Sequence, residues 1–206
     1  MEDFDKEKHW QHIYNTKELN EVSWYQPVPE TSLSLIEKYN IPKSAKIIDI
    51  GGGDSFLVDN LLKAGYTNVT VLDISDAALE RVKKRLGEDA GKVKWIVADA
   101  SNFISSEQYD FWHDRAAFHF LNNRKEIDSY IHNVANAIVS GGIAVIGTFS
   151  ENGPKKCSGI EITQYSKEGL AHEFSGSFEN LTCFNIDHKT PFDTIQNFTF
   201  CSFRRR

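Results

Sequence analysis

A strand that runs directly into three glycines constrains the fold of this chain more than any other stretch. Residues 47–55 read Ile-Ile-Asp-Ile-Gly-Gly-Gly-Asp-Ser, and apolar side chains recur behind them at helical spacing. The glycines therefore occupy a strand-to-helix corner, where glycine permits positive φ and lets a ligand approach the backbone. The amides that open the next helix offer donors and a partial positive charge. The corner favours a nucleotide-type ligand, although an ordinary tight turn has the same pattern.

Length and charge limit the remaining possibilities. The chain has 206 residues, enough for one domain with a full core. Its formal net charge of −6 argues against a nucleic-acid partner, because phosphates require a basic surface, and we interpret residues 204–206 as a frayed arginine tail. No apolar run reaches membrane-spanning length, and the acidic first residues lack secretory character. We therefore expect a soluble, cytoplasmic protein without a membrane partner.

Three cysteines, Cys157, Cys183 and Cys201, are scattered along the chain. Their odd number and wide spacing favour free thiols in a reducing compartment over a disulfide framework. Cys157 could contact a soft substrate atom or be an inert thiol. Because it lacks a neighbouring Cys or His at metal-ligand spacing, we expect no metal site.

Strand and helix patterns alternate from residue 45 onward. The apolar runs predict strands at 47–50, 69–73, 93–99, 109–114 and 143–149. A capping box at Asn123 and Glu126 predicts the start of a helix that ends at the glycines 141–142. This alternation implies parallel pairing through right-handed crossovers. We predict an α/β fold with a doubly wound, mostly parallel sheet and helices on both faces.

The two ends of the chain follow a different pattern. Near the C-terminus, a short helix at 166–174 precedes strand-like runs at 181–186 and 198–203, which predict an antiparallel hairpin. Residues 1–43 contain two amphipathic helical patterns and are expected to form an N-terminal cap or lid on a ligand-binding domain at 44–206. Between these helices, Trp24 and Tyr25 either plug the core or cover a ligand.

Acidic side chains end four of the predicted strands. In an open parallel sheet the ligand crevice lies at these carboxyl ends. Asp73 follows Gly53 by 20 residues, the spacing at which a carboxylate binds the ribose hydroxyls of an adenosine group. Nicotinamide dinucleotides and S-adenosylmethionine both contain this group. A pyrophosphate binder needs a further glycine at position 56, which is Phe here, so the pattern favours S-adenosylmethionine.

These motifs resemble class I S-adenosylmethionine-dependent methyltransferases over about residues 44–203: Asp49 to Gly53, Asp73, Asp99-Ala100 and the closing hairpin. The resemblance implies a seven-stranded sheet whose last strand is antiparallel. The third small position of the family's loop is Ser55 here. Residues 9–10 and 23–25 also resemble small bacterial methyltransferases and a group related to protein-lysine methyltransferases.

The resemblance also implies how the cofactor binds. The glycine loop backs its methionine portion, Asp73 holds the ribose, and Asp99 meets the adenine amino group with Ala100 beside it. The residues expected to bind S-adenosylmethionine are Asp49, Gly51, Gly52, Gly53, Asp73, Ile74, Asp99, Ala100, Asp114 and Tyr25.

In this fold the residues after the fourth strand usually face the methyl group, which makes Asp114, Arg115 and His119 the candidate catalytic residues. His119 could accept a proton from the acceptor or be a packed, hydrogen-bonded histidine. Asp114 could orient cofactor or substrate and Arg115 could pair with an acidic substrate group. The two could equally form a structural ion pair.

No motif identifies the methyl acceptor. We favour a small molecule, because the charge is acidic and the aromatic-rich flanks can enclose a modest pocket. The alternatives are a lysine on a protein, a module that binds S-adenosylmethionine without transferase activity, and a dehydrogenase.

Overall fold

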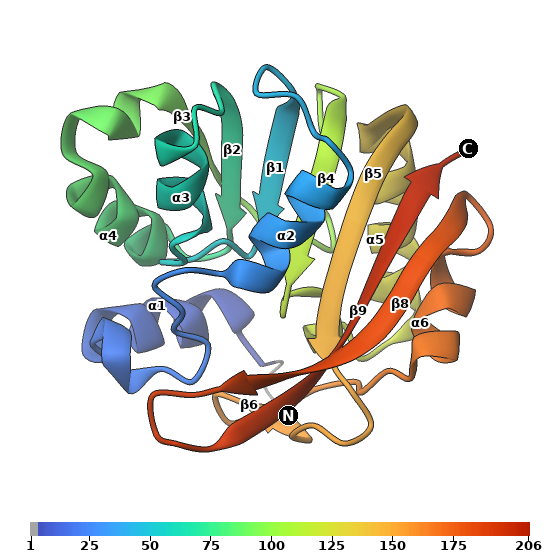
Figure 1. The fold of residues 1–206 in the computed structure, drawn as a ribbon. Helices are drawn as coiled ribbons and strands as arrows, with labels where there is room; N and C mark the ends of the chain where they lie inside the picture. Colours follow the sequence, from blue (N-terminus) through green and yellow to red (C-terminus); the bar gives the residue numbers. More distant parts are fainter. Residues whose placement is uncertain (1–3) are drawn as a thin grey trace.

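Strands and helices alternate through the computed structural model, which describes residues 4–206 (Figure 1). The strands are β1 (Lys46–Ile50), β2 (Asn68–Asp73), β3 (Val93–Val97), β4 (Tyr109–Arg115), β5 (Ile138–Phe149), β6 (Lys156–Cys157), β7 (Ile160–Glu161), β8 (Phe178–Lys189) and β9 (Ile195–Arg205). The α-helices are α1 (Lys6–Thr16), α2 (Glu30–Lys38), α3 (Leu57–Lys63), α4 (Asp76–Leu86), α5 (Arg124–Ala137) and α6 (Lys167–Phe174). Short 3₁₀ helices are η1 (Leu19–Glu21), η2 (Gly87–Lys92) and η3 (Phe118–Phe120).

Seven strands form one sheet in the order β3-β2-β1-β4-β5-β9-β8. The first five strands pair in parallel, whereas β9 runs antiparallel to both β5 and β8. The chain leaves β1 toward β2 and β3 and later returns to the other side of β1 with β4, so the order reverses at β1. A ligand crevice is expected at this switch point. The predicted fold class is confirmed.

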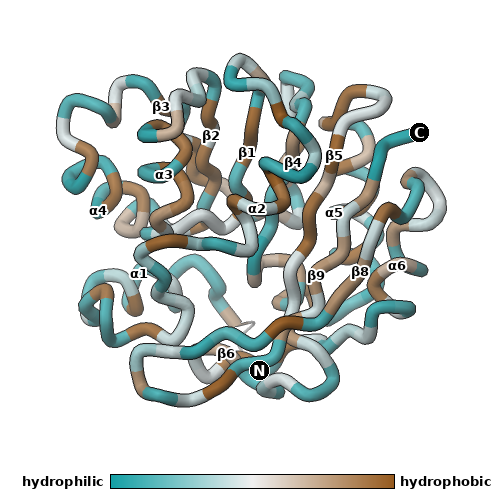
Figure 2. Tube along the Cα trace, in the orientation of Figure 1, coloured by the Kyte–Doolittle hydropathy of each residue, from teal (hydrophilic) through white to brown (hydrophobic). Residues whose placement is uncertain are grey.

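Strands β1, β2, β4 and β5 are buried on both faces of the sheet, since successive strand residues point to opposite sides and most of them are buried. Ile47 packs with the core residues of α2, α3 and α4, and its neighbour Ile48 packs with those of α5 and α6. Both isoleucines are fully buried. Figure 2 shows the hydrophobic residues concentrated along the strands and on the helices that flank them. The carboxyl ends of the strands are therefore held in fixed positions.

The end of α5 differs from the prediction. The helix begins as expected, with the Asn123 side chain accepting a hydrogen bond from the Glu126 amide at 2.9 Å. It ends at Ala137, however, and Ile138 already pairs with Tyr109 in the sheet. The glycines 141–142 lie within β5 rather than at a helix end. Pairing with a neighbouring strand overrides the helical pattern at Ile138, and the sequence pattern alone does not show that partner.

The C-terminal arginines are ordered, so the interpretation as a frayed tail is wrong. Arg205 belongs to β9, and its Nε donates to the carbonyl oxygen of Ala135 at 2.7 Å. Arg206 donates to the carbonyl oxygen of Ser175 at 3.0 Å. Both guanidinium groups bind backbone carbonyls near the C-terminal ends of helices, where cations are favoured.

A disulfide joins Cys183 of β8 to Cys201 of β9. The expectation of three free thiols is therefore wrong for these two residues, whereas Cys157 is a free thiol. The antiparallel register places Cys183 directly opposite Cys201. Spacing along the sequence carries no information about that register.

The N-terminal segment packs on the carboxyl side of the sheet through α4 (Figure 1). The Gln11 side chain of α1 accepts hydrogen bonds from the Ser75 hydroxyl and the Ala77 amide, both at 2.9 Å. Arg81 of α4 donates to the carbonyl oxygens of Tyr14 and Lys17. These contacts place α1 beside the helix that follows β2.

In the part of the chain that the structure describes, residues 4–206, no helix has both the length and the apolar character that crossing a membrane requires.

Candidate functional site

One pocket opens at the carboxyl ends of β1, β2 and β4. Of the residues predicted to bind the cofactor, those that line it are Asp49, Gly51, Gly52, Asp73, Ile74, Asp99 and Ala100. The structure therefore gathers seven residues from three separate segments into one cavity. A second set, from the N-terminal segment, η3, β6 and β9, lines the opposite wall.

The glycine corner fits tightly between its neighbours. Gly51 and Gly53 adopt φ values of +60° and +48°. A Cβ on Gly51 would lie 2.7 Å from Cβ of Ala117, and one on Gly53 would lie 2.4 Å from the Tyr14 hydroxyl. Larger residues would collide with the protein at both positions. The turn brings bare backbone to the pocket floor.

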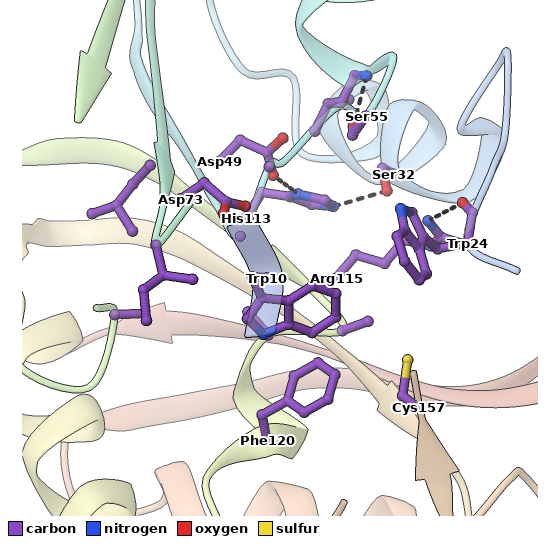
Figure 3. Close-up of a pocket in the computed structure, with 18 of the residues that line it drawn as sticks. Trp10, Trp24, Ser32, Asp49, Ser55, Asp73, His113, Arg115, Phe120 and Cys157 are labelled. Carbon is purple, nitrogen blue, oxygen red and sulfur yellow. Dashed lines mark hydrogen bonds and ion pairs between the residues drawn. The ribbon is translucent and has the colours of Figure 1, made fainter. Parts of the chain in front are cut away.

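A buried hydrogen-bonded chain supports the carboxylate at the end of β1. Nδ1 of His113 lies 2.7 Å from Oδ1 of Asp49, and its Nε2 lies 2.8 Å from the Ser32 hydroxyl (Figure 3). His113 stands opposite Asp49 in the parallel register of β1 and β4. The chain links the glycine corner to α2. Sequence reasoning assigned no site role to His113 or Ser32, and the signal that could have found His113 is its position on the strand beside Asp49.

The acids after β2 and β3 are each held by local donors. The Ser75 amide donates to Oδ1 of Asp73 at 2.8 Å. The amide and hydroxyl of Ser101 donate to Oδ1 of Asp99 at 2.8 and 2.7 Å. Burial raises the pKa of Asp73 to about 7, against the opposing effect of backbone hydrogen bonds. A fixed, buried carboxylate of this kind is suited to accept hydrogen bonds from a ligand.

These residues suit an adenosyl sulfonium ligand. Asp73 and Asp99 can accept hydrogen bonds from hydroxyl and amino groups, and Asp49 carries a charge that favours a cation. Gly51 and Gly52 line the pocket with backbone alone. The three acids would repel a pyrophosphate. The site therefore fits S-adenosylmethionine better than a dinucleotide.

Aromatic rings line the other half of the pocket, which we call the aromatic wall: Trp10, Trp24, Phe120 and Phe198. The Trp10 ring lies edge-on to Phe120 at 5.2 Å and to Trp24 at 5.8 Å between centroids (Figure 3). Trp24 therefore both packs against the Trp10 ring and lines the pocket. Tyr25 instead packs edge-on against Phe56 at 5.7 Å and does not line the pocket.

Arg115 projects into the pocket from the end of β4 (Figure 3). Its Nη1 donates to the carbonyl oxygen of Trp24 at 3.2 Å, and the guanidinium lies over the Phe198 ring at 5.3 Å. Burial lowers the pKa of Arg115 to about 10, so the group stays cationic at neutral pH. Burial raises the pKa of the Cys157 thiol to about 11, which keeps this pocket residue neutral.

Asp114 lies on the other side of the sheet from Arg115. Its Oδ1 accepts the amides of Ala117 and Phe118 at 2.9 and 3.1 Å, and Oδ2 accepts the Tyr130 hydroxyl. Burial raises the pKa of Asp114 to about 6. Asp114 makes no ion pair with Arg115 among the described residues. Its observed contacts fix the turn into η3, and a direct role toward the cofactor stays a prediction.

His119 lies behind the aromatic wall rather than at the pocket surface. Its Nδ1 accepts the Phe149 amide at 3.2 Å, and the ring contacts Phe120 and Phe149 at centroid distances of 4.6 and 4.8 Å. Burial and the Arg115 charge lower the pKa of His119 to about 3, so the imidazole is neutral. The contacts favour a packed histidine, and the role of proton acceptor stays a prediction.

Comparison with known proteins agrees with this geometry. Residues 47–142 match the protein family described as Methyltransferase domain. EEF1A lysine methyltransferase 2 of Homo sapiens is 24% identical over 192 residues, which cover 84% of this chain and 74% of the relative. Methyltransferase srdJ of Neurospora crassa is 32% identical over 126 residues, and the chain spans only 53% of that protein.

Solved structures share the fold at low identity. N-methyltransferase NodS from Bradyrhizobium japonicum, in complex with S-adenosyl-L-homocysteine, superposes with a TM-score of 0.72 at 13% identity, covering 98% of this chain and 99% of NodS. The 1,6-didemethyltoxoflavin-N1-methyltransferase of Burkholderia thailandensis, with bound 1,6-didemethyltoxoflavin and S-adenosylhomocysteine, superposes with a TM-score of 0.69 at 16% identity, covering 87% and 78%.

Proposed function

We propose that this chain, which contains a class I S-adenosylmethionine-dependent methyltransferase domain, transfers the methyl group to a small molecule. The observation that carries the proposal is the division of one pocket into an acidic half beside the glycine corner and an aromatic half beside Arg115. The acidic half suits the cofactor and the aromatic wall can enclose an acceptor of modest size. A solved neighbour of this fold holds a small molecule together with S-adenosylhomocysteine.

In this proposal the acidic half holds S-adenosylmethionine. Asp73 accepts hydrogen bonds from the ribose hydroxyls, and Asp99 accepts one from the adenine amino group. Asp49, held by His113, attracts the cofactor's ammonium group. Ile74 and Ala100 supply apolar surface beside the adenosine.

The cofactor supplies a methyl group on an activated sulfonium. When bound, S-adenosylmethionine would give this methyl group to a lone pair of the acceptor, and the electron pair of the broken carbon–sulfur bond would stay on sulfur. The chain contributes by holding the acceptor in line and by excluding water, which can supply several kcal/mol. A proton leaves the acceptor only when the acceptor arrives protonated. His119 is the proposed acceptor for it, although its ring lies behind Phe120.

Residues 1–43 are proposed to act as a lid over the pocket. Trp10 and Trp24 bring aromatic rings from this segment to the cavity, and Ser32 of α2 contacts His113. Closing such a segment over bound reactants would sequester them from solvent.

A protein lysine is the second candidate acceptor. The observation that favours it is the 24% identity to EEF1A lysine methyltransferase 2, which extends over 84% of this chain and so includes more than the cofactor half. A third candidate is a module that binds S-adenosylmethionine without transferring its methyl group.

Incubation with methyl-labelled S-adenosylmethionine and cell extract, followed by separation by size, tests the proposal. We expect label in the small-molecule fraction, and no label with Asp73→Ala, which removes the proposed ribose contact. Label confined to protein would establish the lysine alternative. Saturable cofactor binding without any labelled product would instead support the non-transferring module.

A further inference from the structure

We propose that the methyl acceptor carries a carboxylate on a planar, apolar body, and that Arg115 binds this carboxylate at the aromatic wall. The inference rests on the proposed function, since it names the substrate class of the same pocket. The proposed carboxylate belongs to the acceptor and not to the methionine portion of the cofactor.

The first support is the unused donor capacity of Arg115. A guanidinium has five N–H donors. Within residues 4–206, Nη1 makes one hydrogen bond, to the carbonyl oxygen of Trp24, and the buried Nη2 has no partner. Leaving a buried charged donor unpaired is costly, and buried charges in folded proteins are generally paired. A carboxylate can satisfy two guanidinium N–H groups at once.

The second support is the balance of charge in this half of the pocket. Arg115 is attracted to Asp49, but that carboxylate is already bound by His113 at 2.7 Å. Lys6 also lines the pocket, where it pairs with Glu126 at 2.8 Å. Among the residues that the structure describes in this half of the pocket, Arg115 is therefore the charged group without an ion-pair partner. In a partly desolvated cavity it attracts an anion and repels an ammonium group.

The third support is the shape and chemistry of the walls. Trp10 and Phe120 are in edge-to-face contact at 5.2 Å, and Phe198 lies beneath the guanidinium. Flat aromatic surfaces of this kind pack favourably against a planar apolar molecule. The same walls could surround a cation, but Arg115 places a positive charge among them. The combination selects a planar anion over a lysine side chain.

The test compares three ligands that share one ring: benzoate, benzamide and benzylammonium. Each is titrated into the full chain saturated with S-adenosylhomocysteine, with binding followed by ligand-observed NMR. We expect benzoate to bind at least tenfold more tightly than the other two. Arg115→Met should abolish this preference, and Arg115→Lys should retain part of it because it keeps the charge. Arg124→Met is the matched control, because Arg124 is a half-exposed arginine of α5 that does not line the pocket.

Several outcomes would overturn the inference. Equal binding of benzoate and benzamide by the wild-type protein, or a preference for benzylammonium, would do so without any variant. A variant that binds S-adenosylhomocysteine more weakly but binds 5′-methylthioadenosine normally would show that Arg115 holds the cofactor's own carboxylate. Failure of the wild-type protein to bind S-adenosylhomocysteine would instead refute the proposed function.

Discussion

Among single residues, Asp73 shows how burial opposes the ionisation of a side chain in the pocket. Burial raises its pKa to about 7 from an ordinary value near 3.8. The folded state therefore binds a proton more readily than the unfolded state between these two pH values. The stability that this proton contributes is complete below about pH 3.8 and is lost as the pH rises through 7. The ionised carboxylate, which can accept two ribose hydroxyls, predominates only above that pH.

We predict that the affinity for S-adenosylhomocysteine rises about tenfold between pH 6 and pH 8, since the ionised fraction of a group with a pKa of about 7 rises by that factor. Asp73→Asn should remove the pH dependence and weaken binding by ~1.5–3 kcal/mol, as expected for hydrogen bonds to a charged group. Calorimetry at several pH values measures both effects.

The control for this experiment is Asp128→Asn, which changes an exposed aspartate paired with Arg124. It should behave as the wild type. An unchanged affinity in Asp73→Asn would refute the assigned ribose contact, and a flat wild-type profile would refute the role of its ionisation.

His113 permits a second test at this scale because its two ring nitrogens have different partners. Asn at this position can reproduce Nδ1 and keep the bond to Asp49, whereas Gln can reproduce Nε2 and keep the bond to Ser32. We predict that His113→Asn retains most of the affinity for S-adenosylhomocysteine and that His113→Gln loses about tenfold, equivalent to ~1.4 kcal/mol.

The analogue 5′-methylthioadenosine lacks the ammonium group that Asp49 is proposed to attract. Its affinity should be the same in both His113 variants, and this comparison separates positioning of Asp49 from a general loss of structure. Equal loss of S-adenosylhomocysteine binding in both variants would mean that His113 acts only through packing.

At the scale of elements, the hairpin of β8 and β9 is joined covalently as well as by its ladder. The Cys183–Cys201 disulfide closes a segment with a sequence separation of 18 residues. Closing a loop of this length lowers the entropy of the unfolded chain and so stabilises the folded state by about 3 kcal/mol. We predict that Cys183→Ser lowers the free energy of unfolding by roughly that amount, as measured by urea denaturation.

Thiol titration of the unfolded protein provides the independent check. We expect one reactive thiol, from Cys157, without reductant and three with it. Three thiols in protein kept free of reductant would contradict the disulfide. Cys157→Ser, which leaves the pair intact, should leave the effect of reductant on stability unchanged.

The ends of helices and strands show which boundaries can be predicted from neighbouring residues alone. Asn123 caps α5 as predicted, because this cap is a hydrogen bond between residues three apart in sequence. The predicted end of α5 was wrong because Ile138 pairs in the sheet with Tyr109, which lies 29 residues earlier in the chain. The length of β8 and β9 was underestimated for the same reason. Each strand extends as far as its partner continues to pair.

At the scale of the whole molecule, ligand binding should stabilise the folded chain as a unit, because the pocket draws residues from α1 to β9. A ligand at 100 times its dissociation constant contributes about 2.7 kcal/mol, which for a domain of this size corresponds to a rise in Tm of about 5–10 °C. We predict this shift with S-adenosylhomocysteine in a thermal unfolding experiment. A comparable shift with a nicotinamide dinucleotide alone would favour a dehydrogenase instead.

Local sequence patterns were enough to predict the α/β class, the glycine corner and most of the acidic half of the pocket. Strand periodicity, helix caps and the 20-residue interval from Gly53 to Asp73 are properties of short segments. Parallel pairing then brings the carboxyl ends of the strands together, so the corner, Asp73 and Asp99 had to meet at one edge.

The other half of the pocket depends on how distant segments of the chain pack together. The aromatic wall combines Trp10, Phe120 and Phe198, which are far apart in the chain. The bond from His113 to Asp49 and the Cys183–Cys201 disulfide both depend on strand register. Register and docking result from the summed packing of the whole core rather than from any local pattern. For that reason the sequence indicated the cofactor and an acidic group as a possible partner of Arg115, whereas the unpaired donor of Arg115 and the aromatic rings around it came from the folded chain.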